Sequence, residues 1–536
     1  MKRPRNRSAA LIASLAAALV AASVLVANGT TARTASSTTL VIDNSFTIKT
    51  ADPGRAFDPT ASLIDHALYD TLFTYKGGDL AHPIPLLVRS YKATANAKTY
   101  TFQLKRNVHF ADGTPLTAAD VAWSLRRLVN LKGNPSFLLA GITVAAPSKY
   151  TVVMRSKTPA TQLPVILANP STGVLNSALV KKNGGTDASN AAKADKAETW
   201  LNSPGSAGAG SGPFVLNAYS TTSQITLTPN TRYWGAKKPR WSSVVVRNMV
   251  AATQLLNVGR GSHEIAVDLS ADQALTLKGN KNVRVVLQPS TWIFFVWANN
   301  DPKVSDVTSN QNFQKAVRYG LDYSSLVNLA GKGAIQAAGV IPSMFLGSLP
   351  QSARVRTSVA RAKAALAASG VGDQKVTMIY PSDLTINGVP FTSMAQKVQA
   401  SLRAIGMNIE LSGSPTSNWL DDYRSGKAAF GLSLWGPDYP DPADYLVFTP
   451  GQLVGLRAGW PKGGNPAIEK LAAKAMVTTA PGARAVIYRS IQRLLNQRGP
   501  FFPLIQPTQV FVTTKDLRGA IYNSVYTVDV AQVSPA

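Results

Sequence analysis

The sequence predicts an α/β protein with more than one domain, and three observations lead to that prediction. The chain has 536 residues, more than one hydrophobic core usually covers, so we expect two or three domains. Hydrophobic residues make up 45% of it, enough to bury large cores. Helical and strand patterns alternate in its C-terminal half, which favours an α/β lobe.

The first third of the chain shows a strand, a helix and a capped helix in order. Val41 to Ile48 mixes apolar and polar residues as a strand does, and residues 63–73 carry apolar residues at helical spacing. Residues 100–104 alternate as a half-buried strand. Thr117 then caps a helix, with Asp120 three residues on as its capping-box partner.

The rest of the chain repeats the helix and strand signals after a long polar stretch. Residues 184–212 are rich in Gly, Ala, Ser, Asn and Asp and indicate a boundary loop. Residues 291–299 form a strand crowded with aromatic side chains, in which Trp292 and Phe294 point one way and Phe295 the other. The later segments alternate between helix and strand: helix 358–369 stopped by Gly370, strand 375–380, helix 391–405 stopped by Gly406, and strand 407–411.

The N-terminus is typical of a targeting segment. Lys2, Arg3, Arg5 and Arg7 form a basic start before an apolar run over residues 9–27. Small residues at Ala22, Ala27 and Ala32 offer cleavage sites, so we expect residues 1–35 to be a secretory signal, or else an uncleaved anchor. The chain has no cysteine, which excludes disulfides, thiol catalysis and a lipid-modified N-terminal cysteine.

The charge and the missing motifs exclude several classes of protein. The formal net charge is +27, but no basic run exceeds two residues, so nucleic-acid binding is not expected. Neither a nucleophile elbow, nor a P-loop, nor a dinucleotide fingerprint, nor a His-Glu-x-x-His motif occurs. The four histidines lie far apart in sequence, and we expect each to be structural. We therefore expect no catalytic residue, no cofactor and no metal.

Several motifs occur in a characteristic order. An Asp-Pro at 58–59, the Tyr-Asp-x-Leu-Phe of 69–73 and the Thr-capped helix are followed by Gly-Ser-Gly-Pro-Phe at 210–214 and by Asn-x-x-Tyr-Trp-Gly at 230–235. In this order they resemble the family-5 extracellular solute-binding proteins, which serve dipeptide, oligopeptide and nickel ABC importers. The resemblance covers the mature chain, although Phe313-Gln314 departs from the Val-Arg of the family pattern.

The resemblance implies a bilobal, periplasmic-binding-protein-like α/β fold of the large class with an extra peripheral domain. The expected boundaries are lobe I over 38–71, 206–290 and 505–536, the peripheral domain over 72–205, and lobe II over 291–504. The ligand is then expected in the cleft between the lobes, which close over it.

The segment Leu434 to Tyr445 has the most chemical content. Trp435 and Asp438 match the Trp-x-x-Asp that pairs with the ligand's α-ammonium in peptide-binding members of the family, and Tyr439 and Trp292 join them as candidate ligand-binding residues. Asp441 and Asp444 are interpreted as turn caps, in a segment where Pro440 and Pro442 forbid a regular helix. Residues 428–434 contain no basic side chain, which weakens the case for a ligand carboxylate.

The predicted function is capture of small peptides outside the cytoplasm for delivery to an ABC permease. The expected protein is a secreted monomer, on the periplasmic side or at the outer face of the membrane. Two alternatives remain open: a protein of the same fold that binds a non-peptide solute (an amine, a metal chelate or a sugar), and a secreted hydrolase.

Overall fold

The computed structural model describes residues 38–536, which form one compact unit. The predicted secretory segment, residues 1–35, lies outside the described residues. No helix among residues 38–536 has the length and apolarity needed to cross a bilayer.

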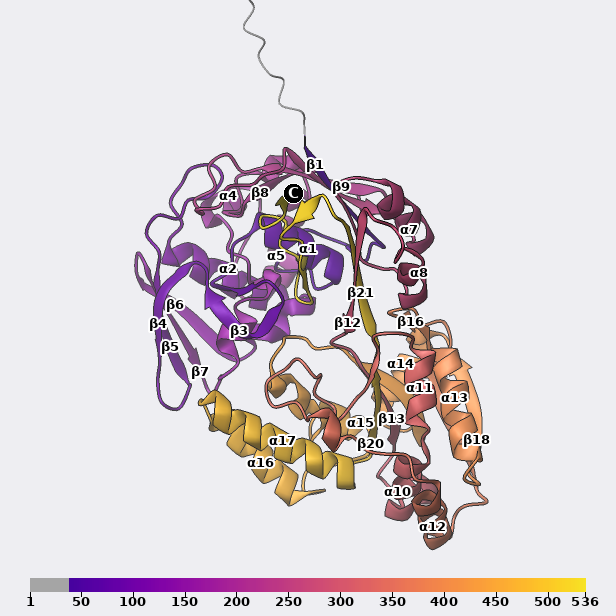
Figure 1. Cartoon of the computed structure of the whole chain (residues 1–536). Helices are drawn as coiled ribbons and strands as arrows, with labels where there is room; N and C mark the ends of the chain where they lie inside the picture. Colours follow the sequence, from indigo (N-terminus) through magenta and orange to yellow (C-terminus); the bar gives the residue numbers. More distant parts are fainter. Residues whose placement is uncertain (1–37) are drawn as a thin grey trace, which may run out of the picture. The chain divides into compact units, whose positions relative to one another are not determined.

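The first large sheet is mixed and has seven strands, in the order β12-β21-β11-β1-β10-β9-β8. Its central strand β1 pairs in parallel with β10 and β11, and the other neighbours are antiparallel. The strands come from three distant parts of the chain: β1 Thr39–Asn44, β8 Phe214–Ala218, β9 Gln224–Pro229, β10 Ser243–Asn248, β11 Glu264–Ala266, β12 Val283–Pro289 and β21 Thr508–Thr514. Helices α1 (Pro59–Leu68), α7 (Ala251–Arg260) and α8 (Ala271–Thr276) accompany this sheet (Figure 1).

The second large sheet has six strands, in the order β14-β20-β13-β19-β15-β18. Its strands are β13 Ile293–Ala298, β14 Ile335–Gln336, β15 Lys375–Pro381, β18 Asn408–Ser414, β19 Phe430–Trp435 and β20 Phe501–Gln506. As predicted, the aromatic strand β13 alternates, with Phe294 in one core and Phe295 in another on the opposite side. The helices of this part of the chain are α9 Asp306–Ser309, α10 Gln311–Gly320, α11 Tyr323–Leu329, α12 Val359–Ser369, α13 Phe391–Arg403, α14 Thr416–Ser425, α15 Leu453–Arg457, α16 Pro466–Val477 and α17 Pro481–Arg498.

A four-stranded antiparallel sheet, β4-β5-β7-β6, lies apart from both large sheets at the left of Figure 1. Its strands are β4 Val88–Ala93, β5 Thr99–Leu104, β6 Ile142–Ser148 and β7 Thr151–Ser156, and the long helix beside it is α2 Ala118–Leu131. The predicted capping box of α2 is confirmed, because the Asp120 carboxylate accepts hydrogen bonds from the backbone and hydroxyl of Thr117. A hairpin, β2 Phe73–Lys76 and β3 Asp79–Pro85, leads into this sheet. The boundary segment 184–212 also contains short helices: α5 Ala191–Ala194, α6 Glu198–Leu201 and the 3₁₀ turn η3 Pro204–Ser206.

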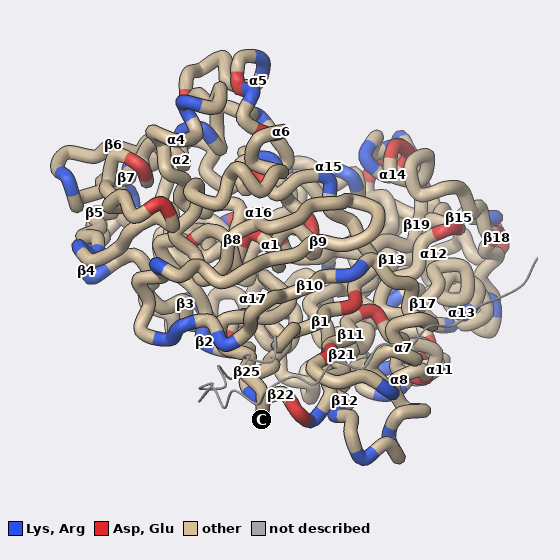
Figure 2. Tube along the Cα trace, turned by 90° about the horizontal axis from the view of Figure 1, so that it is seen from above, with Lys and Arg blue, Asp and Glu red and all other residues tan. Residues whose placement is uncertain are grey.

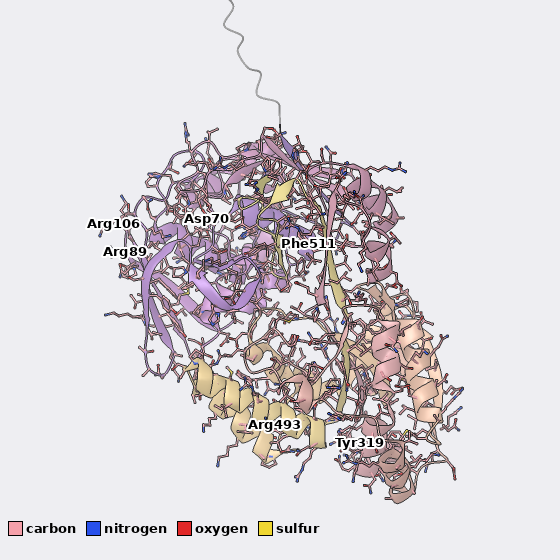
Figure 3. All side chains as sticks on the ribbon, in the orientation of Figure 1. Asp70, Arg89, Arg106, Tyr319, Arg493 and Phe511 are labelled. Atoms are coloured by element: carbon pink, nitrogen blue, oxygen red, sulfur yellow. The ribbon has the colours of Figure 1, made fainter. Side chains whose placement is uncertain are left out.

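Three of the sequence motifs meet at the end of α1. The buried Asp70 carboxylate accepts hydrogen bonds from the Ser211 hydroxyl (2.8 Å) and the Trp234 indole (2.7 Å), and burial raises the pKa of Asp70 to about 6 (Figure 3). Gly212 packs so closely that a Cβ there would lie 2.5 Å from the Ala67 carbonyl oxygen. These motifs therefore build the fold.

The same junction corrects one predicted boundary. The helix expected over residues 63–73 runs over 59–68 instead, because Asp58 caps it and Pro59 supplies its first residue. It ends at Leu68, whose carbonyl accepts the backbone N–H of Gly212 (3.0 Å). Residues 69–73 continue as extended chain and turn into the β2–β3 hairpin.

The two large sheets are joined by only two chain segments among the described residues. Residues 290–292 lead from β12 to β13, and Pro507 leads back from β20 to β21. The segments lie side by side, because Ser290 N–H donates to the Pro507 carbonyl (2.8 Å) and the Gln506 side chain donates to the Ser290 carbonyl (2.8 Å). The predicted lobe and domain boundaries remain predictions, since residues 38–536 form a single compact unit.

Candidate functional site

A cavity of about 280 Å³ lies beside the two connecting segments. Ligand pockets typically measure roughly 300–1,000 Å³, so this cavity suits a small solute. None of its lining residues is charged. They come from the β2–β3 hairpin, the end of β12 and the first connecting segment, a loop before α12, and the C-terminal segment: Gly78, Leu80, Gln288, Pro289, Ser290, Thr291, Ser343, Met344, Tyr522 and Ser524.

Gln506 holds two walls of this cavity in place. Its amide nitrogen donates to the Ser290 carbonyl, and its amide oxygen accepts the backbone N–H of Ser343 (3.0 Å). Gln506 itself is buried at the end of β20. The cavity is therefore braced by the same residue that ties the connecting segments together.

The wall at Thr291 continues into Trp292, the first of the predicted ligand-binding residues. The Trp292 ring packs on Gly436, where a Cβ would lie 2.4 Å from ring carbon Cζ3. Ile293 pairs with Trp435 in the antiparallel β13–β19 ladder, so both tryptophans leave the same edge of the sheet. The β13–β19 register thus brings Trp292, Trp435 and the loop that follows together, and their part in ligand binding stays a prediction.

Asp438 lies in that loop with no cation beside it. Its side chain is half-buried, and the ion pairs of residues 38–536 do not include it. Burial raises the pKa of Asp438 to about 6. Asp438 does not line the 280 Å³ cavity. It lies two residues after Gly436, against which the Trp292 ring packs.

Asp444 is the residue whose position the sequence did not predict. It is 3% exposed, and its Oδ2 accepts hydrogen bonds from the Trp435 indole (3.0 Å) and from the backbone N–H of Asp438 (3.3 Å). Burial, followed by the nearby Asp438 carboxylate, raises the pKa of Asp444 well above its usual range. In the sequence, only the spacing of Asp438, Asp441 and Asp444 at every third residue could have indicated that Asp438 and Asp444 lie close together.

Asp441, in contrast, has the structural role that was predicted. It caps the 3₁₀ helix η5 (Pro442–Phe448) by accepting the N–H of Ala443, and it forms a buried bidentate ion pair with Arg484 of α17 (2.6 and 3.1 Å). Its charge is therefore neutralised inside the protein. Of the three carboxylates in this segment, only Asp438 and Asp444 have no cationic partner among the described residues.

Tyr439 lies where two hydrophobic clusters meet. It packs against the cluster of the four-stranded sheet, which contains Phe102, and against the cluster around Tyr445 and Trp460. Burial raises the pKa of the Tyr439 phenol well above its usual range, and the neighbouring carboxylates of Asp444 and Asp441 raise it further. Tyr439 therefore joins the acidic loop to the four-stranded sheet.

The histidines do not converge on this site. His66 lies 3.8 Å from Asp529, His82 3.0 Å from Asp79, and His263 3.7 Å from Asp516. Within residues 38–536 no three or more His, Cys, Asp or Glu side chains come together as a metal site.

The fold and the site define a class of protein: a two-lobed α/β protein with a small cavity where its lobes join. The sequence profile described as "Bacterial extracellular solute-binding proteins, family 5 Middle" matches residues 82–452, more than half of the chain. The chain belongs to this family, so the predicted family and fold are confirmed. It is a solute-binding protein of the kind that serves peptide importers.

Individual relatives agree over nearly the whole chain. The "Probable D,D-dipeptide-binding periplasmic protein DdpA" of Escherichia coli is 28% identical over 500 residues, which cover 90% of this chain and 91% of the relative. Among solved structures, HbpA2 from Haemophilus parasuis superposes with a TM-score of 0.79 at 20% identity, over 93% of this chain and 100% of that chain. The E. coli murein tripeptide-binding protein MppA, in its unliganded open form, gives 0.76 at 21% identity, over 94% and 98%.

Proposed function

We propose that this protein captures short peptides outside the cytoplasm and delivers them to an ABC permease, with the peptide's ammonium group bound by Asp438. The observation that carries the proposal is the half-buried Asp438 carboxylate, which has no cation of its own and lies two residues after Gly436, the residue against which the Trp292 ring packs. A buried charge is rarely left without a partner, and an ammonium would supply one through a charge-assisted hydrogen bond. The names of DdpA and MppA, which bind a dipeptide and a tripeptide, support peptides as the solute.

In this proposal the ligand occupies the cavity beside the connecting segments, and its ammonium end reaches past Trp292 to Asp438. The volume favours a short peptide over a long one. The protein acts as a monomer without catalytic activity and reaches its compartment through residues 1–35. Binding shifts an equilibrium between open and closed lobes, and the permease reads the closed form.

One observation favours a second candidate, an amine without a carboxylate. The cavity lining carries no positive charge, and Arg484, the cation paired with the acidic loop, is already bound to Asp441. A peptide carboxylate would therefore have to be held by uncharged donors such as Ser290, Ser343 or Tyr522.

The deciding experiment compares one dipeptide in three forms: unmodified, N-acetylated and C-amidated. We expect N-acetylation to abolish binding in calorimetry, because it removes the charge that Asp438 pairs with, and C-amidation to change the affinity little. Equal loss on both modifications would contradict the charge-based assignment. Native mass spectrometry of the purified protein identifies any solute that copurifies.

Substitution tests the residue itself. We expect Asp438→Asn to weaken the unmodified peptide by about 1.5 kcal/mol or more, the order of a hydrogen bond to a charged group. Asp373→Asn, in an exposed turn between α12 and β15, removes the same charge far from the loop and is the matched control. Unchanged affinity in Asp438→Asn would move the ammonium site elsewhere.

A further inference from the structure

The basic residues of the four-stranded sheet are not balanced by acidic ones. The strands and hairpins of residues 88–111 and 140–160 contain eight Lys or Arg and no Asp or Glu. The whole chain has 55 basic and 28 acidic residues, a ratio at which about four acidic residues would accompany these eight. The ratio of basic to acidic residues in this sheet is therefore higher than in the chain as a whole, which is itself basic.

Two of the cations, Lys92 and Arg155, project from the outer side of this sheet. Tyr100, Phe102 and Leu104 of β5 are buried on the side of α2, so Thr99 and Thr101 face outward. Lys92 pairs with Thr101, and Arg155 pairs with Thr99, and residues directly opposite in a ladder share a face. We call this outer side, with the strand ends next to it, the basic face.

One end of the basic face carries four cations: Lys92, Lys98, Arg155 and Lys157. The backbone of Lys98 is hydrogen-bonded to Ser156, which precedes Lys157, so the four lie at the same end of three neighbouring strands. All four side chains are exposed. Figure 2 shows blue segments at the margin formed by β4, β5 and β6.

The opposite end carries three more: Arg89, Arg106 and Lys149. Lys105 turns instead toward the Trp234 ring, 5.1 Å from its Nζ. Lys105 N–H donates to the Leu87 carbonyl, which brings Arg106 beside Arg89, and Figure 3 shows these two arginines next to each other at the outer margin. Arg106 and Lys149 both lie over the ring of Tyr150.

None of the eight has an ionic partner among residues 38–536. The Lys and Arg ion pairs of the described residues use other cations: Arg55, Arg126, Arg127, Arg247, Lys375 and Arg484. Like charges on neighbouring strands repel one another and destabilise a sheet. A fold that gathers seven of them on the outer side and at the strand ends of one sheet gains from an anionic partner.

We propose that the basic face binds the anionic lipid headgroups of a membrane surface. The outward residues between the cations are small or polar, such as Ser90, Thr101 and Thr143, so they form neither a groove for a polymer nor a platform for stacked bases. The two clusters lie at opposite ends of six-residue strands, roughly 17 Å apart, a separation that suits a plane of many headgroups better than one small anion. The Tyr150 ring at one end of the face lies under Arg106 and Lys149, and the rest of the argument for binding is charge, so the association is electrostatic and is weakened by salt.

The association would keep a soluble carrier close to the membrane that holds its permease. It goes beyond solute capture, because the basic face uses none of the proposed ligand residues. It also holds whichever solute the cavity takes.

The test is sedimentation of residues 38–536 with vesicles of phosphatidylcholine, with and without phosphatidylglycerol. We expect binding only to the anionic vesicles, and its loss at high salt. The variant K92Q/K98Q/R155Q/K157Q should lose about tenfold or more of its vesicle affinity, since each cation near an anionic surface contributes to binding. The matched control K303Q/K315Q/K363Q/K397Q removes four exposed charges from helices and loops of the part of the chain that holds the six-stranded sheet. It should keep the parent affinity.

Three results would overturn the proposal. The first is equal loss in both variants, which would attribute binding to net charge alone, and the second is absence of binding to anionic vesicles. The third is equal or tighter binding of a soluble glycerol-phosphate polymer with the same dependence on the basic face, which would assign the face to a wall polymer. If the first variant does not fold, R89Q/R106Q/K149Q tests the other end of the face in the same assay.

Discussion

At the scale of single residues, Asp438 and Asp444 are the unusual pair. Two carboxylates lie in one loop, joined through the backbone N–H of Asp438, and no cation neutralises them among the described residues. The titratable groups packed around them are Asp441, already paired with Arg484, and the neutral phenols of Tyr439 and Tyr445. Burial raises the pKa values of both carboxyl groups. The Asp438–Asp444 pair therefore keeps a proton at pH values where two exposed carboxyl groups would both be ionised.

This pair makes peptide affinity depend on pH. The ammonium binds the ionised carboxylate of Asp438, whose pKa in the empty protein is about 6. Affinity should therefore be low below pH 6, rise as the pH passes through 6, and level off above it. Calorimetry at several pH values, in buffers of different ionisation enthalpy, should also detect a proton released on binding below about pH 6. An affinity that is flat from pH 5 to 8 would contradict this expectation.

The same pair has a consequence for stability without any ligand. A carboxyl group whose folded pKa is raised adds stability that is fully present below its unfolded value of about 3.9 and is lost as the pH rises through the folded pKa. Asp444→Asn removes this loss, because the amide cannot ionise. We expect the variant to melt above the parent protein at pH 8 and close to it at pH 4. Asp373→Asn should follow the parent at both values.

At the scale of elements, the Asp441–Arg484 ion pair fixes the acidic loop to helix α17. Both side chains are buried, so Arg484→Met leaves an unpaired charge and should lower the apparent free energy of unfolding by about 3 kcal/mol or more. The double variant Asp441→Asn/Arg484→Met should recover most of that loss, since asparagine still caps η5 and carries no charge. A double variant as unstable as the single one, in urea unfolding, would show that the arginine contributes through packing alone.

Local signals were sufficient to predict most elements but not the site as a whole. The capping box at Thr117, the aromatic alternation of β13 and the glycine stop of α12 depend on neighbours along the chain. Trp292 and Trp435 were grouped as candidate ligand-binding residues from the family resemblance, and it is the β13–β19 register that brings them close. The cavity could not be predicted, because Met344 and Tyr522 reach it from distant segments, and Gln506, which braces its walls, is placed by the register of β20. The prediction that Asp444 caps a turn failed for a similar reason. A carboxylate that caps a turn and one that accepts a hydrogen bond from an indole elsewhere in the fold look the same in the sequence.

At the scale of the whole molecule, the two connecting segments are the place where the lobes can move. Short parallel links that carry few contacts allow hinge closure, with the change taken up by a few backbone angles. Because the chain has no cysteine, two introduced ones can be labelled without interference. We expect dyes at exposed Lys193→Cys and Lys363→Cys to show a change in energy transfer on peptide binding, and the Asp438→Asn protein to show it only at higher peptide concentration. A transfer efficiency that saturating peptide leaves unchanged would mean that binding occurs without closure.

The pairing of β12 with β21 has one more consequence. Pro289 and Thr508 face each other in the ladder of the first sheet, and Phe294 and Ile505 face each other in that of the second. Everything between them, more than two hundred residues, is thus inserted where a two-residue hairpin turn would suffice. The two ends of this inserted segment lie next to each other. The whole segment can therefore be replaced by that of a related protein without changing the path of the rest of the chain. The positions after Pro289 and before Thr508 are therefore suitable fusion points for chimeric binding proteins, in which one lobe comes from this chain and the other from a relative with a different solute preference.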